Sequence, residues 1–114
     1  MSEFPLRSWL MMAALTASLA ACSLIQPNPP NELTPEGKQV RVIERASDTA
    51  ACRSLGKITG RAASVVGKVD VVEDQTVDAR NKAAKAGGNA ILRRENPSPV
   101  AEPGTQAFEV FLCP

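Results

Sequence analysis

The strongest constraint on this fold is an apolar run near the N-terminus that ends at a cysteine. Arg7 precedes the run, residues 9 to 19 are mostly apolar, and the run closes with Leu19-Ala20-Ala21-Cys22. A membrane span needs about 20 apolar residues, so this run is too short to cross a bilayer. A charge, a short apolar run and small residues before a cleavage point are typical of an export signal. The fold must therefore be built from residues 22 to 114, which suffice for one domain but not for two.

The end of the run resembles the lipobox of bacterial lipoproteins, in which the cysteine is acylated after the signal is cut away. The resemblance implies a lipoprotein signal peptide over residues 1–21 and a lipidated Cys22 as the first residue of the mature chain. The alternative is an ordinary secretory peptide, with Cys22 as a structural cysteine. An aspartate after Cys22 would resemble an inner-membrane retention signal, but Ser23 stands there. By this analogy we expect a lipid-anchored protein on the periplasmic face of the outer membrane.

Composition narrows the classes of function. The chain has 13 basic and 12 acidic residues, no histidine and no tyrosine. Near-neutral charge argues against a nucleic-acid partner, which a basic stripe would mark. Without histidine, the usual activator of a nucleophile and the commonest metal ligand are both missing. We therefore expect no enzyme, no cofactor and no metal site.

Two cysteines remain once Cys22 is lipidated, namely Cys52 and Cys113. In an oxidising exported compartment, an even pair favours one structural disulfide. Two independent buried thiols are the first alternative, and a redox-active pair is the second. Redox-active pairs usually lie close together as C-x-x-C, whereas these cysteines are far apart in the sequence.

Proline punctuates the stretch after Cys22. Residues 22–37 combine the lipidated N-terminus with four prolines and polar neighbours, which favours an extended spacer. We expect a tether that could lift the domain about 40 Å from the membrane, at about 3.1 Å per residue. The folded domain is expected over residues 38–114.

Apolar periodicity within this domain predicts strands and one helix. Alternation of polar and apolar residues indicates strands over residues 39–44, 52–62, 89–94 and 106–113, with a break in phase at Gly56. Residues 63–74 are expected to form a loop, with at most a short extended piece. A helix over 76–86 follows from a stripe at helical spacing, formed by Val72, Thr76, Ala79, Ala83 and Ala86. Asp74 is its expected N-cap, and Gly87-Gly88 ends it. The fold class is α/β (α+β), a small sheet of about four strands with one helix packed on a face.

Several of these segments resemble a family of small proteobacterial lipoproteins of unknown function. That family is distantly similar to the outer-membrane lipoprotein that senses envelope stress for the Rcs phosphorelay. The segments are Cys52 to Gly60, the helix run Ala79-Arg80-Asn81-x-Ala83-Ala84, the turn Gly87 to Leu92, and a last strand ending in cysteine. The resemblance implies the fold and a Cys52–Cys113 bridge more than it implies signalling, because the stress sensor has four domain cysteines. Among the residues of this resemblance, we interpret Arg80 as a member of a pair on the helix surface and Asn89 as a turn residue that bonds the backbone.

Three classes of function follow. The first is a non-enzymatic interaction or envelope-stress-related module, anchored to the membrane by its lipid and with an envelope protein as its candidate partner. The second is a periplasmic binder of a small ligand or envelope polymer. A hydrolase is the third and weakest, because a carboxylate pair would have to come from Glu73, Asp74 and Asp78, for which helix capping is a simpler explanation. Close helix packing leaves little room for a cleft, so we expect function on a surface, such as a sheet edge or the loop over residues 96–104.

Overall fold

The computed structural model describes residues 29–67, 70–97 and 102–114. The expected signal peptide and Cys22 lie outside these residues. Four strands and one long helix follow in the order β1 (Arg41–Ile43), β2 (Arg53–Arg61), α2 (Val71–Lys85), β3 (Ala90–Arg93) and β4 (Thr105–Leu112). Two short 3₁₀ turns, η2 (Gly37–Gln39) and η3 (Ala46–Thr49), flank β1.

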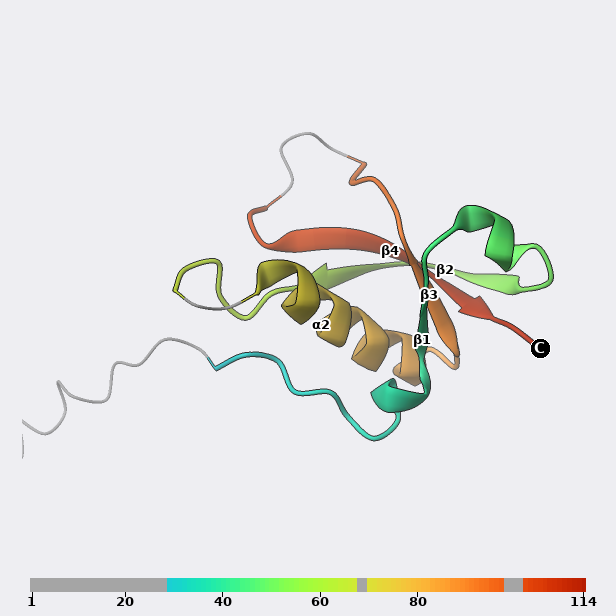
Figure 1. The fold of residues 1–114 in the computed structure, drawn as a ribbon, viewed down its shortest axis with the longest axis horizontal. Helices are drawn as coiled ribbons and strands as arrows, with labels where there is room; N and C mark the ends of the chain where they lie inside the picture. The colour runs from blue at the N-terminus through green and yellow to red at the C-terminus, as the bar shows by residue number, and fades with distance from the viewer. Residues whose placement is uncertain (1–28, 68–69, 98–101) are drawn as a thin grey trace, which may run out of the picture.

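The strands form one mixed sheet in the order β1-β3-β4-β2. β1 pairs with β3 in parallel, whereas β4 pairs antiparallel with both β3 and β2. Helix α2 lies across one face of the sheet and connects β2 to β3 (Figure 1). The expected sheet of about four strands with a single packed helix is therefore confirmed.

Helix α2 starts earlier than its sequence suggested. It begins at Val71, and Asp70 caps it by accepting a hydrogen bond from the Glu73 amide at 3.2 Å. The expectation of a loop through residue 74, with Asp74 as the cap, is therefore wrong. The other end agrees with the sequence, because the chain turns at Gly87 with a φ of 82°.

The face of the sheet under α2 is packed with apolar side chains. Ala79 and Ala83 are fully buried and let the helix lie close to the strands. The sheet covers only the middle of the predicted stripe on α2. At the two ends of the stripe, Val72 is 56% exposed and Ala86 is exposed too. The buried cluster on this face consists of Val40, Ala79, Ala83, Ile91, Phe108 and Val110.

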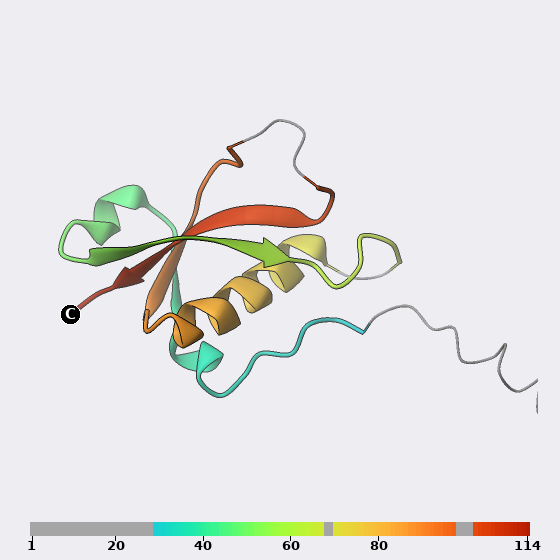
Figure 2. The same ribbon diagram turned by 180° about the vertical axis from the view of Figure 1, so that it is seen from behind.

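The opposite face holds a second apolar cluster and the disulfide. The cluster consists of Ile43, Ala90, Leu92, Phe111 and Cys113, with Cys52 packed against it. Cys52 and Cys113 are joined by a bond of 2.02 Å between their sulfur atoms. The predicted bridge is therefore present, and it ties the start of β2 to the end of β4. Figure 2, which shows the molecule from behind, has these two strands side by side.

A bulge interrupts β2 where the sequence changed phase. The register with β4 shifts between Ser54 and Gly56, and Gly56 has a φ of 112°. Only glycine adopts such a conformation without strain, which explains the residue at this position. The bulge keeps Leu55 and Ile58 on the α2 side despite their odd spacing.

The segment before the sheet is not a free tether throughout. Residues 31 to 37 lie along α2 and are hydrogen-bonded to it, so the packed part of the chain begins before residue 38. The spacer between Cys22 and the domain is correspondingly shorter than the sequence suggested. Among the described residues, no helix combines the length and the hydropathy needed to cross a membrane.

Candidate functional site

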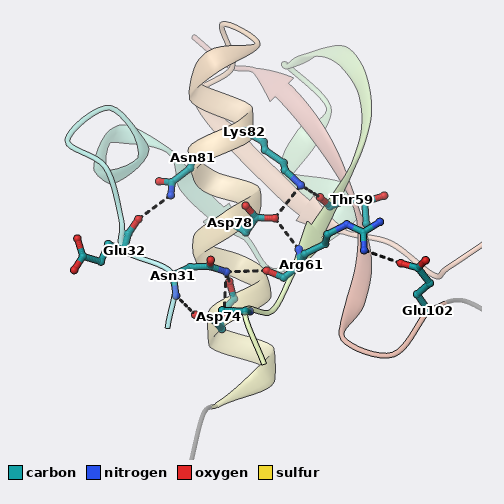
Figure 3. Close-up of polar contacts among 10 residues, drawn as sticks. Asn31, Glu32, Thr59, Arg61, Asp74, Asp78, Asn81, Lys82 and Glu102 are labelled. Carbon is teal, nitrogen blue, oxygen red and sulfur yellow. Dashed lines mark hydrogen bonds and ion pairs between the residues drawn. The ribbon is translucent and has the colours of Figure 1, made fainter. Parts of the chain in front are cut away.

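A buried carboxylate fixes the N-terminal segment to the helix. Asp74 is 4% exposed, and its side chain accepts hydrogen bonds from the Asn31 amide at 2.7 Å and from Asn31 Nδ2 at 3.1 Å. The Ala63 amide also donates to this carboxylate, at 2.6 Å. Bonds from several N–H groups satisfy the buried charge and hold three segments together. Figure 3 shows Asn31 facing Asp74 across the helix surface.

A second contact lies further along the same helix. Asn81 Oδ1 accepts from the Thr34 amide at 2.9 Å, and Asn81 Nδ2 donates to the Glu32 carbonyl at 2.8 Å. We call the two contacts together the latch, formed by Asn31, Thr34, Asp74 and Asn81. Because Asp74 and Asn81 lie at different points along α2, the two contacts align the segment with the helix axis.

Arg80 does not form the surface pair that the sequence suggested. Its guanidinium donates to the Val40 carbonyl at 2.8 Å and to the Lys38 carbonyl at 3.2 Å. These bonds attach the chain just before β1 to α2. Asn89 is the turn residue expected, because its side chain exchanges two hydrogen bonds of 2.8 Å with the backbone of Cys113.

Two of the three acidic residues considered for a carboxylate pair, Asp74 and Asp78, have carboxylates that accept hydrogen bonds from backbone amides. Asp78 accepts from the Arg61 amide at 2.7 Å and pairs with Lys82 at 2.9 Å. Asp74 is occupied by the latch, and the Glu73 amide is held by Asp70. Within the described residues, no group of acids and cysteines is arranged to hold a metal ion.

One edge of the sheet is covered by side chains of α2. Lys82 Nζ donates to the Thr59 carbonyl at 2.7 Å, and Asp78 accepts from the Arg61 amide, so the outer backbone groups of β2 are bonded here (Figure 3). A bonded stretch of an edge cannot add a further strand, so the β2 edge is closed at its Thr59 to Arg61 end. The other edge strand of the sheet is β1.

The β1 edge carries apolar and charged side chains. β1 is the outermost strand on its side, and Val42 is 40% exposed. An open depression beside it is lined by Arg41, Val42, Ile43, Glu44, Arg45 and Asp48. A short edge strand with acidic and basic side chains beside it offers backbone hydrogen bonds and ion pairs to a partner.

A charged cluster occupies the sheet face away from α2. Glu109 accepts from Ser54 Oγ at 2.7 Å and pairs with Arg94 at 2.8 Å. The Ser54 hydrogen bond, followed by the bond and charge of Arg94 and the charge of Lys57, lowers the pKa of Glu109 below its ordinary value. Lys57, Arg94 and Glu109 line a shallow polar depression open to solvent, together with Arg93 and Glu95.

Sequence reasoning missed the latch because its residues are far apart in the chain. A local signal did exist in the stretch Thr34-Pro35-Glu36-Gly37, where a threonine followed by proline is typical of a helix start. In the structure Thr34 Oγ1 accepts from the Gly37 amide at 3.0 Å at the start of η2. That signal would have extended the domain toward the N-terminus, but it would not have identified Asp74 as the partner.

The fold and the site define a small disulfide-linked α+β domain with its N-terminal segment fastened to the helix. The chain belongs to the DUF4156 family, a domain of unknown function, whose family model matches residues 31–113. The match begins at Asn31, the first residue of the latch. Comparison with curated proteins and with solved structures finds no match to this chain.

Proposed function

We propose that this protein is a lipoprotein anchored by Cys22 to the periplasmic face of the outer membrane, where its domain acts as a non-enzymatic interaction module. The latch is the observation that carries the proposal. A segment that leads directly from Cys22 is hydrogen-bonded to α2 through Asn31 and Thr34. An anchored domain would then be held in one orientation, which suits a module that presents a surface.

The β1 edge is the surface we assign to a partner protein of the envelope. In a parallel pair, alternate residues direct their backbone groups away from the neighbouring strand. The Arg41 amide bonds the Asn89 carbonyl in the β3 direction at 3.0 Å, so the polar groups of Val42 point outward. An envelope-stress role, suggested by the resemblance to the Rcs sensor lipoprotein, would use such a contact to report on its partner.

A periplasmic ligand binder is the alternative function. The depression lined by Lys57, Arg93, Arg94, Glu95 and Glu109 favours it, because three cations and two acids converge there on a polar ligand or envelope polymer. Its open shape gives a ligand little buried area, which is why we prefer the interaction module.

The anchor is tested by substituting the lipidated residue. We expect Cys22→Ala to abolish acylation and leave either an uncleaved precursor or a soluble periplasmic form. Membrane fractionation and mass measurement of the mature N-terminus distinguish these products from wild type. A Cys22→Ala protein that is correctly processed and still sediments with the membrane would contradict the lipid anchor.

The partner surface is tested by photo-crosslinking in the full-length protein in intact cells. A photo-reactive residue replaces Val42 on the β1 edge, and the matched control replaces Lys85, which is exposed at the end of α2. We expect a discrete adduct from position 42 and none from position 85. Equal labelling at both positions, or none at position 42, would argue against the β1 edge.

A further inference from the structure

The loop between β2 and α2 presents two adjacent apolar side chains to solvent. Val65 is 52% exposed and Val66 is 70% exposed. One exposed valine is ordinary on a protein surface, but neighbouring ones at the projecting end of a loop are less so. We call residues 64–67 the valine loop.

The base of the valine loop lies beside the point where the chain leaves toward Cys22. Asn31 Nδ2 donates to the Arg61 carbonyl at 2.7 Å, just before the loop. The Ala63 amide donates to the same Asp74 carboxylate that binds Asn31. Both ribbon views place the loop and the first described residues at the same end of the molecule (Figures 1 and 2).

Chain length limits how far this end can stand from a lipid anchor. The peptide from Cys22 to Pro29 spans at most about 25 Å even when fully extended, at about 3.3–3.6 Å per residue. The nine residues of β2 are about 30 Å long at about 3.3 Å per residue. An anchor at Cys22 therefore keeps Pro29, which lies at the same end of the molecule as the valine loop, within about 25 Å of the membrane.

We infer that the valine loop rests on the lipid surface, with Val65 and Val66 inserted among the headgroups. This inference depends on the lipid anchor under the proposed function. Asp70 and Glu73 are exposed at the adjacent helix start and would be repelled by anionic lipid. We therefore attribute the contact to the apolar valine side chains and not to attraction between charges. The domain would then have two attachments to the bilayer, and η3 and the β1 edge would lie away from it.

A tryptophan placed in the loop reports on this contact. The mature lipidated protein with Val66→Trp, which has no other tryptophan because Trp9 lies in the expected signal peptide, is purified from membranes and reconstituted into phosphatidylethanolamine–phosphatidylcholine vesicles that contain brominated acyl chains. The matched control carries Ser47→Trp, because Ser47 is exposed in η3 at the other end of the sheet. Flotation of the vesicles measures anchoring in both variants.

We expect the Val66→Trp variant to lose at least half its fluorescence to the brominated lipid and to emit at shorter wavelength, and the Ser47→Trp variant to do neither. Raising the fraction of anionic lipid should not increase the quenching. If both variants float but show equal quenching, the inference fails and the anchor stands. If neither variant floats, the proposed anchor fails and the inference falls with it.

Discussion

Between α2 and the sheet, six buried apolar side chains pack together, whereas the opposite face combines a second apolar cluster with a disulfide and a charged cluster. The first face depends on shape. Ala79 and Ala83 touch the sheet directly, and a side chain at Gly60 would collide with the Gln75 carbonyl of the helix. Among the described elements no α-helix covers the second face, and covalent and charged contacts accompany its smaller apolar cluster.

The difference teaches how a domain this small divides its stability. A core drawn from fewer than about 80 residues supplies only about 3–5 kcal/mol by itself, so natural domains of this size add a covalent link. Here the link is placed on the face with less apolar packing. Removing it should therefore cost more than disturbing either face by one side chain.

The largest expected effect comes from opening the disulfide. Cys113→Ser in a Cys52→Ser background releases a closed loop with a sequence separation of 61 residues. On the chain-entropy model this lowers the free energy of unfolding by about 4 kcal/mol. Urea denaturation followed by circular dichroism, with reduced wild type as the control, measures the loss. Equal midpoints for oxidised and reduced protein would contradict this division of stability.

An intermediate effect is expected from overfilling the α2 face. Ala83→Leu forces extra atoms between helix and sheet, which should lower the free energy of unfolding by about 1–3 kcal/mol. Ala86→Leu is the matched control, because Ala86 is exposed at the end of the same helix. Thermal melts of the two variants give the comparison. A loss of the same size from Ala86→Leu would mean that helix propensity, and not close packing, sets the effect.

The smallest effect is expected in the charged cluster, and it depends on pH. The lowered pKa of Glu109 means that its stabilising effect is complete above its ordinary value of 4.5 and is lost as the pH falls through the folded-state value. Glu109→Gln should therefore cost less than about 1 kcal/mol at neutral pH and nothing at about pH 2. Melting temperatures measured across this range, with Glu95→Gln as the control, test the sign. A loss for Glu109→Gln that grows toward low pH would contradict the assignment.

The sequence predicted the sheet, the bulge at Gly56 and the burial of Ala83 because each depends on local periodicity or a single special residue. It misplaced the start of α2 because Val71 and Val72 resemble a strand and Asp74 resembles a cap. Asp74 instead has its hydrogen-bond partners at Asn31 and Ala63, which no local pattern connects to it. The latch was missed for the same reason, since proline content describes the backbone of residues 31–37 but not what they pack against.

The latch also determines how the domain would respond to mechanical load. Tension applied through an anchor at Cys22 reaches the fold at Asn31, where hydrogen bonds to Asp74 and to the Arg61 carbonyl meet. The segment continues along α2 to Thr34 and Asn81, so the pull would load α2 and the end of β2 together. Under the proposed anchor, tension would thus strain the N-terminal segment and its hydrogen bonds before it reached the Cys52–Cys113 bridge at the other end of β2.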